Sequence, residues 1–115
     1  MHELSVLNKA IDTVSKIAEE NDVQKIAYIT LEIGELTGYL PVFFEKYFPI
    51  VIEDKPLFQD AKLYMRVIKG EALCEDCQTL YNVMKNEGKC PKCHSRRKKI
   101  LGGQDFIIKE IGIEE

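Results

Sequence analysis

No apolar stretch in this sequence is long enough to cross a membrane. The longest one, PVFFEKYFPIVI at residues 41–52, is much shorter than the ~20 residues that a spanning helix needs, and it contains two charged residues. An apolar leader before the first amphipathic segment is also lacking. We therefore expect a cytoplasmic protein that has no membrane partner.

The sequence also lacks recognisable groups of catalytic residues. The sequence places no nucleophile beside a base, and the loop GELTG at residues 34–38 does not match a phosphate-binding loop. Histidine occurs only twice, as His2 and His94. These absences indicate a protein that binds a ligand without performing catalysis.

Positive charge is outnumbered by negative charge overall but is concentrated in one segment. The net charge of −3 argues against general binding of nucleic acid. Residues 71–99 nevertheless contain seven Lys or Arg against four Asp or Glu, whereas the remainder of the chain is acidic. We interpret the basic run HSRRKK at residues 94–99 as a solvated face. The alternative is an adaptor that binds nucleic acid or a protein partner, with Arg96 and Arg97 making the contacts.

The residues that are present predict an α+β fold. Apolar residues recur at helical spacing from about residue 4 to Glu20, and apolar and polar residues alternate over residues 23–34. A second helix is expected from Pro41, with a kink or an early end near Phe48, because Pro49 removes a helical hydrogen bond. Further strands are expected at residues 61–68 and 102–115. The inward-facing residues are expected to be Leu4, Leu7, Ile11, Val14, Ile17 and Ala18 in the first helix and Leu63, Met65 and Val67 in the second strand.

These elements predict a small three-stranded sheet with two helices and an inserted zinc-ribbon module that contains the four cysteines. We expect the strands at 61–68 and 102–115 to pair antiparallel, because they flank the insert. The predicted domains are residues 1–70 together with 101–115, and the insert at residues 71–100.

The cysteines form two CxxC pairs, Cys74 with Cys77 and Cys90 with Cys93, with twelve residues between them. Each CxxC turn can direct two thiolates toward one ion, and two such turns complete the tetrahedron that Zn²⁺ prefers. Because all four positions are cysteine, none is left for water, so we predict a structural zinc. Zinc-coupled folding contributes roughly 10–16 kcal/mol in small peptides, and we expect this module to depend on its metal.

Three other interpretations of the cysteines compete with zinc. Paired disulfides conflict with a reducing compartment. A thioredoxin-like redox site would leave the second CxxC pair unexplained. The run CPKCH at residues 90–94 matches the pattern of covalent haem attachment, but that chemistry normally follows export and would leave the first pair without a role.

The chain opens with MHELSV, and its first residues can chelate a metal ion. A large second residue such as His2 generally blocks removal of Met1, which leaves a free amine next to a histidine. That amine, the deprotonated backbone nitrogen of His2 and its imidazole Nδ1 can close adjacent chelate rings. A planar set of nitrogens suits Ni²⁺ or Cu²⁺ better than Zn²⁺, and cytosolic copper is mostly Cu(I), which prefers sulfur, so nickel is favoured.

Several motifs occur together in a specific order. These are MHELSV at the start, LEIGELTG at residues 31–38, the two CxxC pairs and the closing strand FIIKEIGIEE. In this order they resemble the HypA/HybF family of hydrogenase-maturation nickel metallochaperones over essentially the whole chain. In that family a glycine often follows each CxxC pair, whereas Gln78 and His94 stand there in this sequence.

The resemblance implies two metal sites. It implies transported Ni(II) at an N-terminal site built on Met1, His2 and the Glu3 backbone, within the domain formed by residues 1–70 and 101–115. It also implies a structural Zn(II) on the four cysteines. The implied partners are a HypB-type accessory GTPase, the [NiFe]-hydrogenase large-subunit precursor and, in some organisms, urease with its accessory proteins. A monomer or weak homodimer is expected.

Two residues keep more than one interpretation. His94 is either solvated beside the zinc turn, a further nickel ligand, or an exchange ligand on zinc that would couple the two sites. The Glu3 carboxylate either contacts a partner or holds His2 in place.

Overall fold

The computed structural model describes residues 2–114, which form two compact units. Within the described residues, unit 1 comprises residues 2–32, 39–66 and 107–114, and unit 2 comprises residues 33–38 and 67–106. The predicted division into independent domains, with boundaries at residues 70–71 and 100–101, stays a prediction that removal of the metal would test. Neither helix within residues 2–114 combines the length and the apolar character that a membrane span requires.

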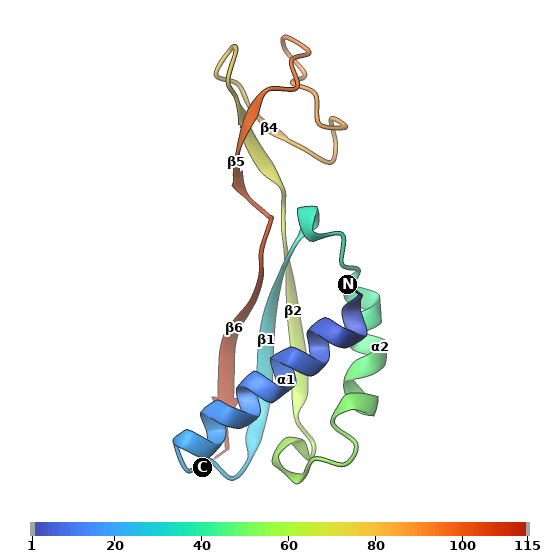
Figure 1. Ribbon diagram of the computed structural model, residues 1–115, viewed down its shortest axis with the longest axis vertical. Helices are drawn as coiled ribbons and strands as arrows, with labels where there is room; N and C mark the ends of the chain where they lie inside the picture. The colour runs from blue at the N-terminus through green and yellow to red at the C-terminus, as the bar shows by residue number, and fades with distance from the viewer. Residues whose placement is uncertain (1, 115) are drawn as a thin grey trace. The chain divides into compact units, whose positions relative to one another are not determined.

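Unit 1 contains helices α1 (Glu3–Glu20) and α2 (Pro41–Val51), which pack against each other (Figure 1). It also contains a three-stranded sheet with the strand order β2-β1-β6. The strands are β1 (Ile26–Gly34), β2 (Lys62–Ile68) and β6 (Phe106–Ile113), and a short 3-10 helix, η2 (Pro56–Phe58), precedes β2. The predicted α+β architecture with two helices and a three-stranded sheet is confirmed. The buried residues of unit 1 include Leu7, Ile11, Val14, Ile29, Leu31, Phe44 and Phe58.

The predicted pairing of the strands that flank the insert is wrong. β1 lies between β2 and β6, so these two strands do not touch. The backbone N–H of Gly34 donates to Asp105 O at one end of the β1–β6 pair, and that of Glu114 donates to Lys25 O at the other, which makes the pair antiparallel. β1 takes the central position and is the most buried of the three strands: five of its nine residues are buried, against none in β2 and one in β6.

Parts of the expected core are also corrected. In α1, Leu4 and Ile17 are 37% and 40% exposed, and Val6 and Ala10 are buried instead. In β2, Val67 is 52% exposed. α2 does not end early at Phe48, because the buried side chains of Phe48 and Val51 hold its last turn in place around Pro49.

Unit 2 contains a second sheet of order β4-β3-β5, formed by β3 (Glu71–Cys74), β4 (Leu80–Asn82) and β5 (Lys98–Gly102), in which β3 pairs antiparallel with both neighbours. Its buried core contains only Ala72, Cys74, Tyr81 and Cys90. The short 3-10 helix η1 (Glu35–Thr37) belongs to this unit. The carboxylate of Glu35 accepts hydrogen bonds from the Gly70 backbone N–H at 2.8 Å and from Asn82 Nδ2 at 3.4 Å, which ties η1 to β3 and β4.

Candidate metal sites

The two CxxC turns of unit 2 bring four sulfur atoms together. All four Sγ atoms lie within 4.8 Å of one another, with 3.5 Å between Cys74 and Cys93 and 3.5 Å between Cys77 and Cys90. Four thiolates around a zinc-sized ion at Zn–S of about 2.3 Å would lie roughly 3.8 Å apart. The sulfur positions therefore suit a tetrahedral metal ion bound by four thiolates, with no coordination position left open.

The two turns have the same backbone geometry, even though neither is followed by glycine. Gln78 and His94 both adopt left-handed conformations, with φ of 65° and 64°. Gln78 N–H donates to Cys74 O at 3.0 Å, and His94 N–H donates to Cys90 O at 2.9 Å. The two turns thus adopt one conformation without a following glycine, and two non-glycine residues are held in the left-handed region.

Side chains around the turns join one CxxC turn to the other. The Asp76 carboxylate accepts a hydrogen bond from the Ser95 hydroxyl and lies 2.8 Å from the Arg97 guanidinium. Arg96 donates to Glu87 O at 3.5 Å. Both arginines of the basic run therefore contact the module itself. This bracing by Asp76 was absent from the sequence analysis, because nothing in the local pattern pairs residues 76 and 97.

The thiols differ in acidity. The Thr79 hydroxyl, 3.1 Å from Cys77 Sγ, stabilises the thiolate and lowers the pKa of Cys77 to about 6. The Ser95 backbone amide acts in the same direction on Cys93, but burial and hydrogen bonds with the other three sulfurs outweigh it and raise the pKa of Cys93 to about 12. Four adjacent thiolates repel one another, so a bound cation is needed before all four can lose their protons.

The N-terminal residues lie at the start of α1. His2 is exposed, has an extended backbone (φ −112°, ψ 171°) and caps the helix without a side-chain hydrogen bond. The Glu3 carboxylate accepts a hydrogen bond from the Leu40 backbone N–H at 2.9 Å, and this contact lowers the pKa of Glu3. Met1, the remaining predicted nickel ligand, lies outside the described residues. Leu40 is a contact that the sequence analysis missed, since 37 positions separate it from Glu3.

His94 is exposed and stands apart from the sulfur cluster. Among the described residues, the one group of three or more His, Cys, Asp or Glu side chains close enough to share an ion is the four cysteines. No element of the structure brings His94 into that group.

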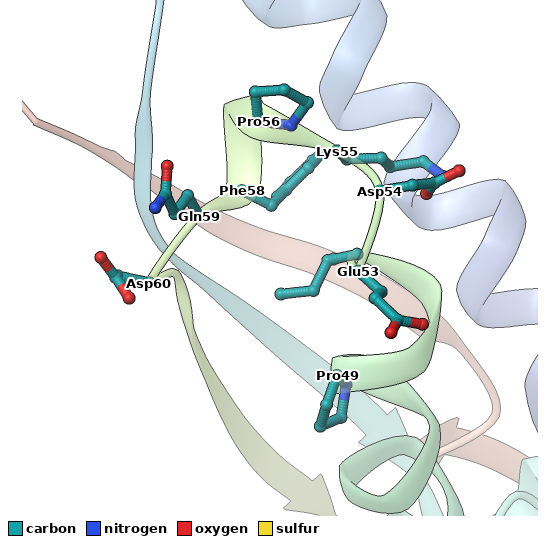
Figure 2. A pocket seen from close by; sticks show the side chains of 9 residues that line it. Pro49, Glu53, Asp54, Lys55, Pro56, Phe58, Gln59 and Asp60 are labelled. Atoms are coloured by element: carbon teal, nitrogen blue, oxygen red, sulfur yellow. The ribbon is translucent and has the colours of Figure 1, made fainter.

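A separate hollow of about 520 Å³ lies between the end of α2 and the start of β2. Pro49 and Pro56 lie on opposite sides of it, with Glu53, Asp54 and Asp60 along its rim (Figure 2). Lys55 pairs with Asp54 at 3.4 Å. The lining of this hollow contains neither histidine nor cysteine, and we assign no metal to the hollow.

Comparison with known proteins gives one consistent family. A family model described as HypA, hydrogenase/urease nickel incorporation metallochaperone, matches residues 1–113. The hydrogenase maturation factor HypA of Caldanaerobacter subterraneus subsp. tengcongensis is 41% identical over 54 residues, which are 47% of this chain and 47% of that protein. That of Shewanella sp. (strain MR-7) is 27% identical over 115 residues, covering 100% of this chain and 97% of the relative. The chain spans about half the length of the first relative, and likewise of the Francisella philomiragia protein.

The fold is also similar to solved structures. The solution structure of HypA from Helicobacter pylori, described as a Ni metallochaperone, superposes with a TM-score of 0.70 at 28% identity, over 98% of this chain and 97% of the other. A second HypA solution structure gives the same TM-score over 99% of this chain. The sequence and structural matches agree with each other over nearly the full length.

Proposed function

This chain belongs to the HypA family of hydrogenase/urease nickel-incorporation metallochaperones, and from that premise we propose that it binds Ni(II) at its N-terminus and hands the ion over during enzyme maturation. The family is one of metallochaperones and not of enzymes. The nickel ligands in this proposal are the Met1 amine, the backbone nitrogens of His2 and Glu3, and the His2 imidazole. The cysteine cluster holds Zn(II) as a permanent structural ion, because its four-thiolate tetrahedron leaves no exchangeable position.

The observation that carries the nickel proposal is the arrangement of His2 and Glu3. The imidazole of His2 is exposed at the end of a helix, while the Glu3 carboxylate is held by the Leu40 N–H. The backbone at residues 2–3 is thereby anchored, and the nitrogen donors remain accessible. An exposed site with few ligands suits an ion that must leave again, and nitrogen ligands of this kind release nickel as protons compete for them.

The proposed acceptors follow from the family. Nickel is delivered in the cytoplasm, with a HypB-type GTPase, to the large-subunit precursor of a [NiFe]-hydrogenase, and urease is the alternative recipient. The matching family is described as one of hydrogenase and urease nickel incorporation, and this supports proposing both enzymes as recipients. Purified precursor and purified urease apoprotein, each offered the nickel-loaded protein, would separate these recipients.

Calorimetric titration of Ni²⁺ into the untagged, zinc-loaded protein tests the site. The matched variant carries one extra residue before Met1, which keeps every side chain but removes the free amine from its place beside His2. We expect binding to collapse in the extended protein and in His2→Ala, with zinc content and circular dichroism unchanged. Equal nickel binding by the native and extended proteins would overturn the N-terminal site.

A further inference from the structure

Strand β6 leaves one edge of the unit 1 sheet open. In the order β2-β1-β6 its outer side has no neighbouring strand within residues 2–114 (Figure 1). It is eight residues long, and Ile107 and Ile113 on it are 46% and 50% exposed. Exposed edges of this kind pair readily with another chain, and proteins commonly guard them with basic residues. The opposite edge strand, β2, carries two basic residues, Lys62 and Arg66, whereas β6 carries one basic and one acidic residue, Lys109 and Glu110.

An apolar groove lies directly beside this edge. It has a volume of about 250 Å³ and lies between the end of α1 and the sheet, where it is lined by Ile17, Val23, Ile26, Ile111 and Ile113 among others. Side chains of a strand alternate between its two faces, so Ile111 and Ile113 lie on the groove side of β6 and Glu110 on the opposite side. A strand added to β6 would direct every second side chain toward the groove.

The surroundings of this edge are mainly acidic. The last turn of α1 contains no basic residue and includes Glu20, and Asp22 follows it closely. The carbonyl end of a helix adds partial negative charge there. On the other face of β6, Glu110 is exposed and accepts a hydrogen bond from the Tyr28 hydroxyl at 3.1 Å. Lys109 is the one basic residue of β6, and nearby Lys25 lies 3.7 Å from Glu114.

We propose that the outer edge of β6 and the adjoining groove bind an extended, cationic segment of a partner protein as an added strand. Its backbone pairs with β6, and its apolar side chains enter the groove. Its Lys or Arg side chains alternate with them and lie on the opposite face beside Glu110, while its overall positive charge complements the acidic end of α1 at longer range. This site is independent of the proposed nickel function, since it uses neither the N-terminus nor the cysteines.

The first experiment titrates the ¹⁵N-labelled, zinc-loaded protein with the capped peptide acetyl-KVKVKVK-amide. We expect amide shifts along β6 and residues 17–23, and binding that weakens as salt rises. Two control peptides separate the contributions. The acidic peptide acetyl-EVEVEVE-amide tests charge, and a form N-methylated at alternate residues tests backbone pairing. Neither control is expected to bind.

Variants of the protein localise the contact. Ile113→Ser should weaken binding about five-fold through lost apolar contact. Glu110→Gln keeps an oxygen acceptor for Tyr28 but removes the charge, and it should weaken binding in low salt. Ile50→Ser, at an isoleucine of α2 that is 60% exposed, should leave binding unchanged. The proposal is overturned if shifts fall on β2 instead, if the N-methylated or acidic peptide binds equally, or if β6 of a second copy occupies the edge, seen as concentration-dependent dimerisation in sedimentation.

Discussion

The Glu3 carboxylate lies 2.9 Å from the Leu40 backbone nitrogen, and this hydrogen bond joins the first turn of α1 to the residue before α2. This contact holds residue 3 against a part of unit 1 that is distant along the chain. A carboxylate held in this way positions the backbone of the proposed nickel site. The carboxylate of Glu3 is thus engaged by another segment of the same chain, which gives a structural role to a side chain whose function the sequence left open.

Replacing Glu3 tests that role. Glu3→Ala should lower the free energy of unfolding by about 0.5–1 kcal/mol, because an exposed charge-assisted hydrogen bond is lost, and should weaken nickel binding. Glu3→Gln retains an oxygen acceptor and should behave like the native protein in both assays. Thermal unfolding and Ni²⁺ calorimetry would measure the two effects. If Gln and Ala at position 3 impair nickel binding equally, the carboxylate itself is a ligand.

The same contact predicts an acid transition. The Leu40 hydrogen bond lowers the pKa of Glu3 below its ordinary value of 4.5, so the bond contributes stability above that value. That contribution is lost as the pH falls through the lowered pKa. The Leu40 amide proton should therefore titrate below pH 4.5 in NMR spectra, and Glu3→Gln should abolish this titration. A midpoint above 4.5 would contradict the contact.

The left-handed residues after the CxxC turns predict a gain in stability. Gln78→Gly and His94→Gly should each stabilise unit 2 by roughly 0.5–1 kcal/mol, because relief of strain exceeds the entropy that glycine adds to the unfolded chain. The two variants are also controls for each other, since both turns share one geometry. Calorimetric melting of the zinc-loaded proteins measures the stability. Loss of nickel or zinc in the His94 variant alone would identify His94 as a ligand.

The hydroxyl of Thr79 should influence the pH at which the four-cysteine cluster releases its metal. This hydroxyl lowers the pKa of Cys77 to about 6 in the metal-free cluster, so protons compete with a metal ion for this sulfur only at lower pH than they would for an ordinary thiol. Thr79→Val keeps the side-chain volume and removes the donor, so the pKa of Cys77 rises. Zinc release, followed with a colorimetric chelator, should then begin at higher pH than in the native protein. An unchanged release profile would show that the hydroxyl does not act on the sulfur.

Removal of zinc should unfold unit 2 and leave unit 1 folded. Two of the four residues in the buried core of unit 2, Cys74 and Cys90, are also proposed metal ligands, so little core remains without the ion. NMR spectra recorded after chelation should lose the dispersed signals of residues 71–100 and keep those of α1 and α2. Simultaneous loss of both sets would contradict the predicted division into two domains.

The sequence by itself determined the features that depend on local spacing. Periodicity placed both helices and the three strands of the unit 1 sheet, because the apolar side chains of one helical or extended segment must face one core. The three short strands of unit 2 were not predicted. The CxxC spacing identified the four cysteines that converge, since each pair needs only a single turn to bring its sulfurs together. The opening residues and ordered motifs also identified the family that the comparisons show.

The tertiary structure decided what depends on distant parts of the chain. It placed β1, the strand with the most buried residues, between β2 and β6, although β2 and β6 are the two strands that flank the insert along the chain. The same holds for the bond from Leu40 to Glu3 and for the bracing of Asp76 by Ser95 and Arg97. These contacts join residues 37, 19 and 21 positions apart. A local pattern carries no information about such pairs, and only packing of the whole chain brings them within hydrogen-bonding distance.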